Sequence, residues 1–393
     1  VSAGATVQLE GGETISGTLA FASAANAIYD GRGTYASGLV LGDAYNNITF
    51  NGSGGSWTLD AALDIGGDLA ITAGTLVDGG NNITIEGSWS NSDTYTGTGT
   101  VTFDATSTAI ITTGGVGDGN DFENMSINGS GATYSLSGSL DIDTNLTIIE
   151  GTLQTGKDET SDVTVDGTLN VQDGGTLVVR RSCTACNDLG DGNGNTGAGQ
   201  TLRAGTLTID YGGRINGYAQ GFGPGGGTGD SGSRNGGSYG GVGGYGGVTL
   251  ASTYGSMTNP TSLGSPGSGD ATEAGGGAIT LDITGTATVS GNLSANGGTA
   301  RSSSNRGAGS GCSLNITTDT LTGNGTISAN GGAGDSQGGG GGGGRISLDG
   351  VSTDLFTGNL IVTGGTKGGN SGRGYAGTVY LNSAKRASLT IGG

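Results

Sequence analysis

The chain has 393 residues, of which 92 are glycine and none is histidine, and its formal net charge is −19. Charged residues make up only 12% of the chain, about half of the ~25% usual in globular domains. This composition excludes a Ser-His-Asp triad, a basic surface for nucleic acid and, because glycine does not recur at every third position, collagen.

Short alternating apolar runs, each bounded by Gly, Asn, Asp or Ser, predict β-strands along the whole chain. No window shows apolar residues at helical spacing, and no apolar run reaches the ~18 residues needed to span a bilayer. We therefore predict an all-β protein without substantial helix or transmembrane segment. A start at Val1 fits removal of a secretion signal, and abundant Thr, Ser, Asn and Gly fit a secreted or cell-surface protein.

Residues 1–180 carry a long internal repeat, with a period of 77 in the sequence numbering. Residues 47–76 align without a gap with residues 124–153, and apolar positions recur while polar positions vary, as for Leu63 and Leu140. Because stacked coils bury equivalent side chains above one another, the repeat predicts a long-period parallel β-solenoid.

Residues 181–200 follow no repeat and are predicted to be an inserted loop. Cys183 and Cys186 are expected to form a local disulfide, because a redox CxxC opens a helix and zinc needs further ligands. Four residues have the alternating oxygen spacing of a calcium loop: Asp188, Asp191, Asn193 and Asn195. A cluster of turn-forming residues explains the same four without a metal, and no other cofactor is implied.

Residues 201–393 repeat with a shorter period of 33 or 34, as in "GNLSANGG" at 291–298 and "GTISANGG" at 325–332. Each unit reads as strand, turn, strand and glycine-rich excursion, which predicts a short-period solenoid with glycine-rich lateral loops. Residues 213–221 followed by 246–250 are interpreted as a divergent first copy.

The seven-glycine run of residues 338–344 falls in one of these excursions. We hypothesise that extended glycine segments pack there through their backbones; a flexible loop is the alternative. Five aromatic residues suit contacts with glycans or subunits, although covering the solenoid edge is the favoured interpretation: Tyr218, Phe222, Tyr239, Tyr245 and Tyr254. The third cysteine, Cys312, is expected to be buried.

The segment "FENMSINGSGATYSLSGSLDI", residues 122–142, resembles bacterial β-strand-repeat surface proteins of the adhesin and filamentous-haemagglutinin type. The resemblance covers most of residues 40–180 and, more loosely, the glycine-rich units. It implies a right-handed parallel β-solenoid, export, and a role at the cell surface.

Both ends of the chain have strand-like sequences without a capping helix, which favours head-to-tail stacking of subunits. We therefore expect a structural subunit, not an enzyme, that polymerises with itself by β-edge pairing or strand exchange into an extracellular filament. Three alternatives stay open: a monomeric adhesin that binds glycans or a host surface, a β-helical polysaccharide lyase or hydrolase, and an ice-binding solenoid.

Overall fold

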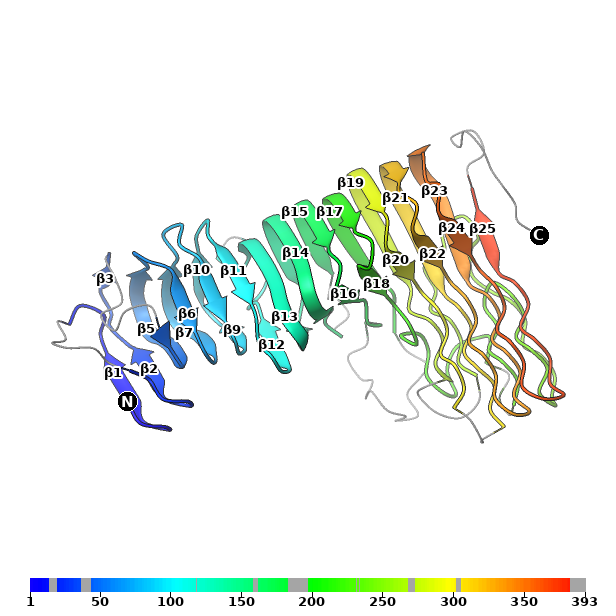
Figure 1. The fold of residues 1–393 in the computed structure, drawn as a ribbon, viewed down its shortest axis with the longest axis horizontal. Coiled ribbons are helices and arrows are strands. Elements are labelled where there is room, and N and C mark those ends of the chain that lie inside the picture. The colour runs from blue at the N-terminus through cyan, green and yellow to red at the C-terminus, as the bar shows by residue number, and fades with distance from the viewer. Residues whose placement is uncertain are drawn as a thin grey trace. The chain divides into compact units, whose positions relative to one another are not determined.

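The computed structural model describes residues 1–13, 20–36, 44–117, 119–157, 162–182, 197–230, 232, 234–267, 273–301 and 305–381. These residues contain no α-helix, and their named strands pair in parallel, which confirms the all-β parallel solenoid (Figure 1). The chain divides into two compact units, one formed by Val1–Gly156 with Asp162–Thr176 and the other mainly by the residues from Leu177 onward.

Short strands in which buried and exposed residues alternate build the first unit. In β6, Leu63 and Ile65 are buried and Asp64 is exposed, as the two-residue period of a strand requires. The strands are β1 (Thr6–Leu9), β2 (Asn26–Tyr29), β3 (Thr34–Tyr35), β4 (Ala44–Tyr45), β5 (Asn47–Thr58), β6 (Leu63–Ile65), β7 (Leu69–Val77), β8 (Ile83–Ile85), β9 (Trp89–Asn91), β10 (Thr94–Thr96), β11 (Thr100–Phe103), β12 (Ala109–Thr112), β13 (Phe122–Ser137), β14 (Leu140–Gln154) and β15 (Val163–Val171); β16 (Gly175–Val178) begins where this unit ends.

Three parallel ladders run through the first unit. They are β2–β5–β7–β9–β12–β13, β4–β6–β8–β11–β13–β14–β15 and β3–β5–β7–β10. Strands β5, β7 and β13 each belong to two ladders, and so does β14, because the pair Tyr134–Leu153 continues the first ladder. The coils are short, since Ile83 pairs with Val101 and Ala109 pairs with Tyr134.

The sequence repeat of the first unit is therefore not the length of a coil, because three or four coils fit within it. Leu63 and Leu140 are both buried, as expected, at 2% and 1% exposure. Leu63 stacks through Ile83 and Val101 on Met125, and not on Leu140, with which the sequence alignment pairs it. The alternation of apolar and polar residues is the same on every ladder, so a sequence alignment can match one ladder with another.

The second unit has two ladders, and its coil has the same length as its sequence repeat. Asn292 pairs with Thr326, and Thr326 pairs in turn with Asn359. One ladder is β17–β19–β21–β23–β25 and the other β18–β20–β22–β24. The strands are β17 (Gln200–Ile209), β18 (Arg214–Asn216), β19 (Ile279–Val289), β20 (Asn292–Ser294), β21 (Ser313–Thr322), β22 (Thr326–Ser328), β23 (Arg345–Asp354), β24 (Asn359–Ile361) and β25 (Thr378–Tyr380).

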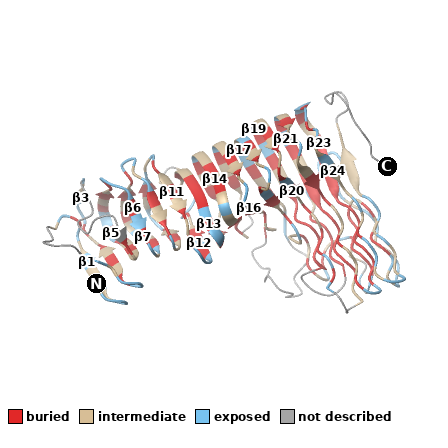
Figure 2. Ribbon diagram, viewed as in Figure 1, coloured by how far each residue is buried: buried red, intermediate tan, exposed pale blue. Residues whose placement is uncertain are grey.

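The first coil of this unit differs from its interpretation as a divergent copy. Residues 213–221 do supply β18, but residues 246–250 form no strand, and the return strand β19 begins only at Ile279. The intervening residues instead add further glycine-rich segments. Figure 1 shows the excursions of successive coils side by side, and Figure 2 shows long stretches of them as buried.

Candidate functional site: a glycine bundle with an open edge

The predicted disulfide and calcium residues, which are Cys183, Cys186, Asp188, Asp191, Asn193 and Asn195, lie outside the described residues. In the part that is described, no group of three or more Asp, Glu or Cys side chains is arranged to hold a metal ion. Cys312 is buried, as expected. Its thiol donates to the Ser262 carbonyl oxygen at 3.1 Å, and burial raises the pKa of the thiol to about 12.

The glycine run 338–344 lies at the centre of a bundle of extended segments. From Gly339 onward, its N–H groups donate in turn to three neighbouring segments at 2.7–3.1 Å. Gly339 and Gly342 donate to Arg234 and Gly237, Gly340 and Gly343 donate to Gly372 and Tyr375, and Gly341 and Gly344 donate to Gly332 and Ala329. Its carbonyls accept from three more segments, through Ala308 and Gly311, Gly241 and Gly244, and Gly365 and Gly368. A period of three without internal hydrogen bonds is that of a polyproline II-type helix.

Only glycine permits this packing distance. A Cβ atom placed on any of the seven residues would lie 1.6 to 2.2 Å from a carbonyl oxygen of a neighbouring segment, whereas ordinary contact begins near 3.4 Å. The neighbouring backbones are themselves held by hydrogen bonds, so they cannot retreat without breaking them. The excursion is thus a buried, packed segment, in which backbone hydrogen bonds replace side-chain contacts.

Arg345, at the start of β23, fastens the inserted residues to the coils. It is only 6% exposed. Its Nη2 and Nε atoms donate to the Tyr254 carbonyl oxygen at 2.8 and 3.0 Å, and its Nη1 donates to Thr378 Oγ1 at 2.9 Å. The guanidinium carbon lies 5.5 Å from the centre of the Tyr239 ring, which adds a cation–π contact. Tyr239 is fully buried and Tyr254 is half-buried, which fits their interpretation as residues that cover the solenoid.

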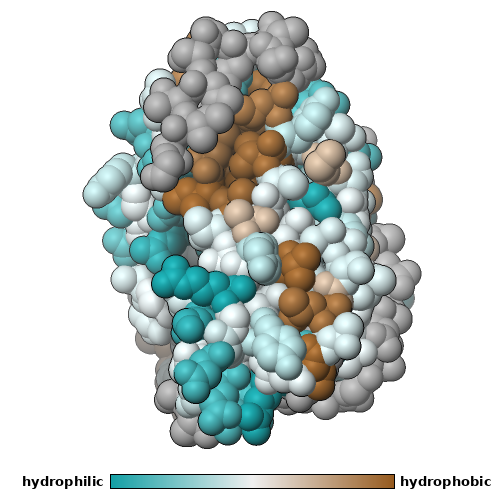
Figure 3. All heavy atoms as spheres, turned by 90° about the vertical axis from the view of Figure 1, so that its right-hand side faces the viewer, coloured by the Kyte–Doolittle hydropathy of each residue, from teal (hydrophilic) through white to brown (hydrophobic). Residues whose placement is uncertain are grey.

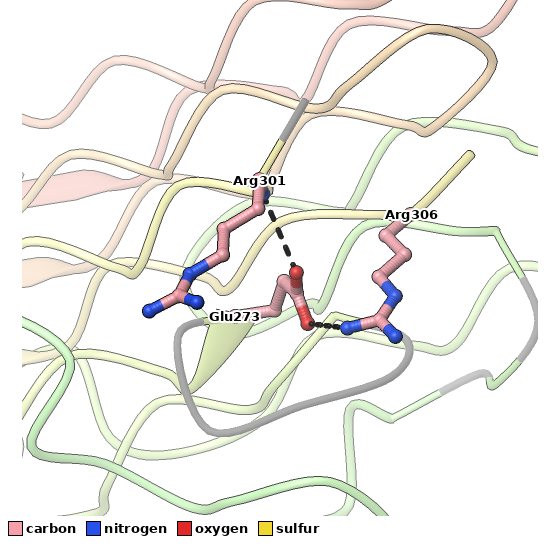
Figure 4. A network of polar contacts seen from close by, with 3 residues as sticks. All are labelled: Glu273, Arg301 and Arg306. Atoms are coloured by element: carbon pink, nitrogen blue, oxygen red, sulfur yellow. Dashed lines mark hydrogen bonds and ion pairs between the residues drawn. The ribbon is translucent and has the colours of Figure 1, made fainter. Parts of the chain in front are cut away.

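A buried carboxylate joins two excursions farther from the strands. The Oε2 atom of Glu273 lies 3.4 Å from Arg306 Nη1, and its Oε1 atom accepts from the backbone N–H of Arg301 at 3.4 Å (Figure 4). In Figure 4 the guanidinium of Arg301 points away from this carboxylate. Because Glu273 has no solvent exposure, its charge depends on these contacts inside the bundle.

Backbone hydrogen bonds join the excursions of successive coils in both directions, since Gly332 and Gly365 donate to Gly309 and Gly341 of the coils before them. The N–H of the earlier coil donates to the carbonyl of the later coil in each of these pairs: Gly297 to Asn330, Gly331 to Thr363, Ala300 to Ala333, Gly334 to Thr366, Ala308 to Gly339, Gly340 to Gly372 and Gly343 to Tyr375. Each coil therefore presents donors to the coil that follows it.

Among the described residues, no further coil supplies acceptors to the N–H groups of the last one. One coil beyond Gly331, Gly334, Gly340 and Gly343 lie the equivalent residues Gly364, Lys367, Arg373 and Ala376. None of these four N–H groups has an acceptor among the described residues. We call these four N–H groups the open edge. On the opposite side of the bundle the equivalent acceptor is capped, since the Gly221 carbonyl oxygen accepts from Arg181 Nη1 at 2.9 Å.

Apolar side chains are also incompletely covered at the two terminal coils. Leu360 and Val379 are half-buried, although the residues on which they stack, Ile327 and Ile346, are fully buried. Figure 3, which faces the right-hand side of Figure 1, shows apolar residues gathered on that face. In the first unit, Val7 and Leu9 of β1 are likewise half-buried, whereas their partners in β2 are fully buried.

Comparison with protein-family models, with curated proteins and with solved structures finds no match to this chain. The functional conclusion therefore rests on the geometry of the protein itself. Sequence reasoning missed the open edge because backbone N–H groups belong to every residue type except proline. The signal in the sequence was the period of the second unit. It places Lys367 and Arg373 at the positions that correspond to the donors Gly334 and Gly340 one coil earlier.

Proposed function

We propose that this protein is a structural subunit that polymerises head to tail into an extracellular filament. The open edge is the observation that carries the proposal. Because each coil of the bundle supplies carbonyl acceptors to the coil before it, the open edge fits a further chain that continues the bundle in the same direction. A heterologous contact fits the edge, and a heterologous contact that does not close into a ring gives an open filament.

The other end of the chain offers a complementary edge. Strand β1 pairs with β2 and has no partner on its other side among the described residues, so its outer N–H and C=O groups are available to a further parallel strand. Val7 and Leu9 are half-buried there and would be covered by another coil. Addition of a subunit would bury them together with Leu360 and Val379.

The distribution of charge along the chain also favours a head-to-tail contact. Residues 1–31 contain Glu10, Glu13 and Asp30 and no Lys or Arg. Residues 355–393 contain Lys367, Arg373, Lys385 and Arg386 and no Asp or Glu. Unlike ends attract and like ends repel, so electrostatics opposes head-to-head and tail-to-tail encounters and speeds head-to-tail ones.

Export is supported by the sequence composition, which is poor in lysine and rich in Thr, Ser, Asn and Gly. The described residues include no helix that is long and apolar enough to cross a membrane. Assembly outside the cell would let the subunits polymerise after secretion.

Negative-stain microscopy and sedimentation of the purified protein test the proposal. We expect filaments of uniform width, with slower growth at ~0.5 M salt than at low salt, because salt screens the attraction between the ends. Dispersed monomers at every salt and calcium concentration would contradict the proposal.

A further inference from the structure

An open groove of about 290 Å³ lies on the β18–β20–β22 ladder of the second unit, away from the open edge. Strand pairing places Arg214 beside Asn292, and aligns Asn216, Ser294 and Ser328 in one column. Tyr218 and Asn296, which follow β18 and β20, complete the lining. Every lining residue is polar except for the ring of Tyr218, so the groove suits a hydrophilic ligand.

Among the described residues, hydrogen bonds use the amide oxygens of Asn216 and Asn296 and leave their NH₂ groups free. Asn216 Oδ1 accepts from the Tyr218 N–H at 2.8 Å and from Ser294 Oγ at 3.1 Å. Asn296 Oδ1 accepts from the Asn330 N–H at 2.6 Å. These bonds fix the orientation of both amides, so that the groups left for a ligand are their NH₂ donors.

A cation without a partner lies beside these donors. Arg214 is exposed and makes no hydrogen bond or ion pair with the described residues, and the side chain of Asn292 likewise has none. A guanidinium has five donors in a planar fork that matches a carboxylate. The groove therefore combines free amide donors with one unpaired positive charge, in a chain whose net charge is −19.

Tyr218 supplies a flat apolar surface next to the donors. Its hydroxyl oxygen accepts from the backbone N–H of Thr299 at 3.0 Å, which holds the ring at both ends, while 44% of the residue stays exposed. An exposed ring with fixed orientation offers its face to the C–H groups of a sugar at low entropic cost.

We propose that this groove binds an acidic polysaccharide, a chain of sugars that carries carboxylates. Arg214 binds a carboxylate, the NH₂ groups of Asn216 and Asn296 donate to ring or hydroxyl oxygens, and Tyr218 stacks against one sugar ring. The proposal does not depend on filament formation, because the groove is complete within one chain.

Calorimetric titration with oligogalacturonate at low salt tests the proposal. We expect Arg214→Gln and Tyr218→Ala each to weaken binding by roughly tenfold, the effect of losing a charged hydrogen bond or a stacked ring. The matched controls are Arg203→Gln and Tyr211→Ala, which alter an exposed arginine and an exposed tyrosine outside the groove, and both should bind as the natural protein does.

Absence of oligogalacturonate binding would overturn the proposal, and so would equal losses in the groove and control variants. Equally tight binding of neutral dextran oligosaccharides, unaffected by Arg214→Gln, would overturn the assignment of an acidic ligand. Thermal melts check that all four variants fold, since Tyr218→Ala also removes the acceptor of the Thr299 N–H.

Discussion

Replacing Gly341 with alanine tests whether backbone packing holds the glycine bundle together. The added Cβ would lie 1.9 Å from the Gly309 carbonyl oxygen, so ordinary contact at 3.4 Å requires a shift of about 1.5 Å. Such a shift breaks the two bonds at Gly309, one to Gly298 and one from Gly332, each 2.9 Å long. Two broken buried hydrogen bonds plus strain in the packing give a loss of about 3–5 kcal/mol.

The matched control is Gly66→Ala in the first unit. Its Cβ would have its nearest neighbours at 3.7 Å, and we expect a gain of about 0.4–1 kcal/mol because alanine restricts the unfolded chain. Amide hydrogen exchange followed by mass spectrometry resolves the two units. We predict exchange at least roughly 100-fold faster in residues 305–344 of the Gly341 variant. Unchanged protection there would refute the packing argument.

Three further changes probe buried and clustered charges. Asp78→Ala removes a buried carboxylate that accepts four hydrogen bonds, one of them from the Tyr95 hydroxyl at 2.8 Å, and should cost about 3–5 kcal/mol in urea unfolding; a loss below ~1 kcal/mol would contradict this role. Burial raises the pKa of Cys312 from 9.0 to about 12, so the contribution of the thiol to stability is complete below pH 9 and is lost between pH 9 and 12. The free energy of unfolding of Cys312→Ala should therefore fall less steeply with pH over that window. Burial and the neighbouring carboxylates, first among them Asp121, raise the pKa of Asp143. Asp143→Asn should therefore stabilise the protein at pH 7 but not at pH 3. Equal effects at both pH values would count against repulsion between these carboxylates.

Strand formation and the coil of the second unit could be predicted from sequence because each rests on local spacing. The short repeat positions Leu293, Ile327 and Leu360 directly above one another in the structure. The long sequence repeat of the first unit did not predict the length of its coil. Trp57 aligns with Tyr134 in sequence, but Trp57 stacks on Leu76 and Tyr134 on Leu153, in different ladders. Apolar alternation specifies that a residue faces inward, but not which ladder it joins.

The candidate sites depend on contacts between distant segments, which local spacing does not reveal. Arg345 reaches the Tyr254 carbonyl, 91 residues away, because the inserted residues return to the coils. The groove requires Arg214 and Asn292 to be neighbours, and they are separated in sequence by the whole insertion. The return point at Ile279 was missed because "GGVTL" at 246–250 has the same composition as a true return strand.

Proline at the open edge tests the central claim most directly. Proline lacks an N–H group, and its fixed backbone angle suits a polyproline II-type segment. Lys367→Pro with Ala376→Pro therefore deletes two donors that have no acceptor among the described residues and should leave the folded monomer intact. The control Lys367→Ala removes the same charge and keeps the N–H.

The decisive measurement is filament length by electron microscopy for these two variants and the natural protein under one condition. We predict long filaments for the natural protein, filaments for Lys367→Ala, and folded monomers for the double proline variant. Filaments of undiminished length from the double proline variant would contradict growth through the open edge, even though the protein would still be a filament subunit.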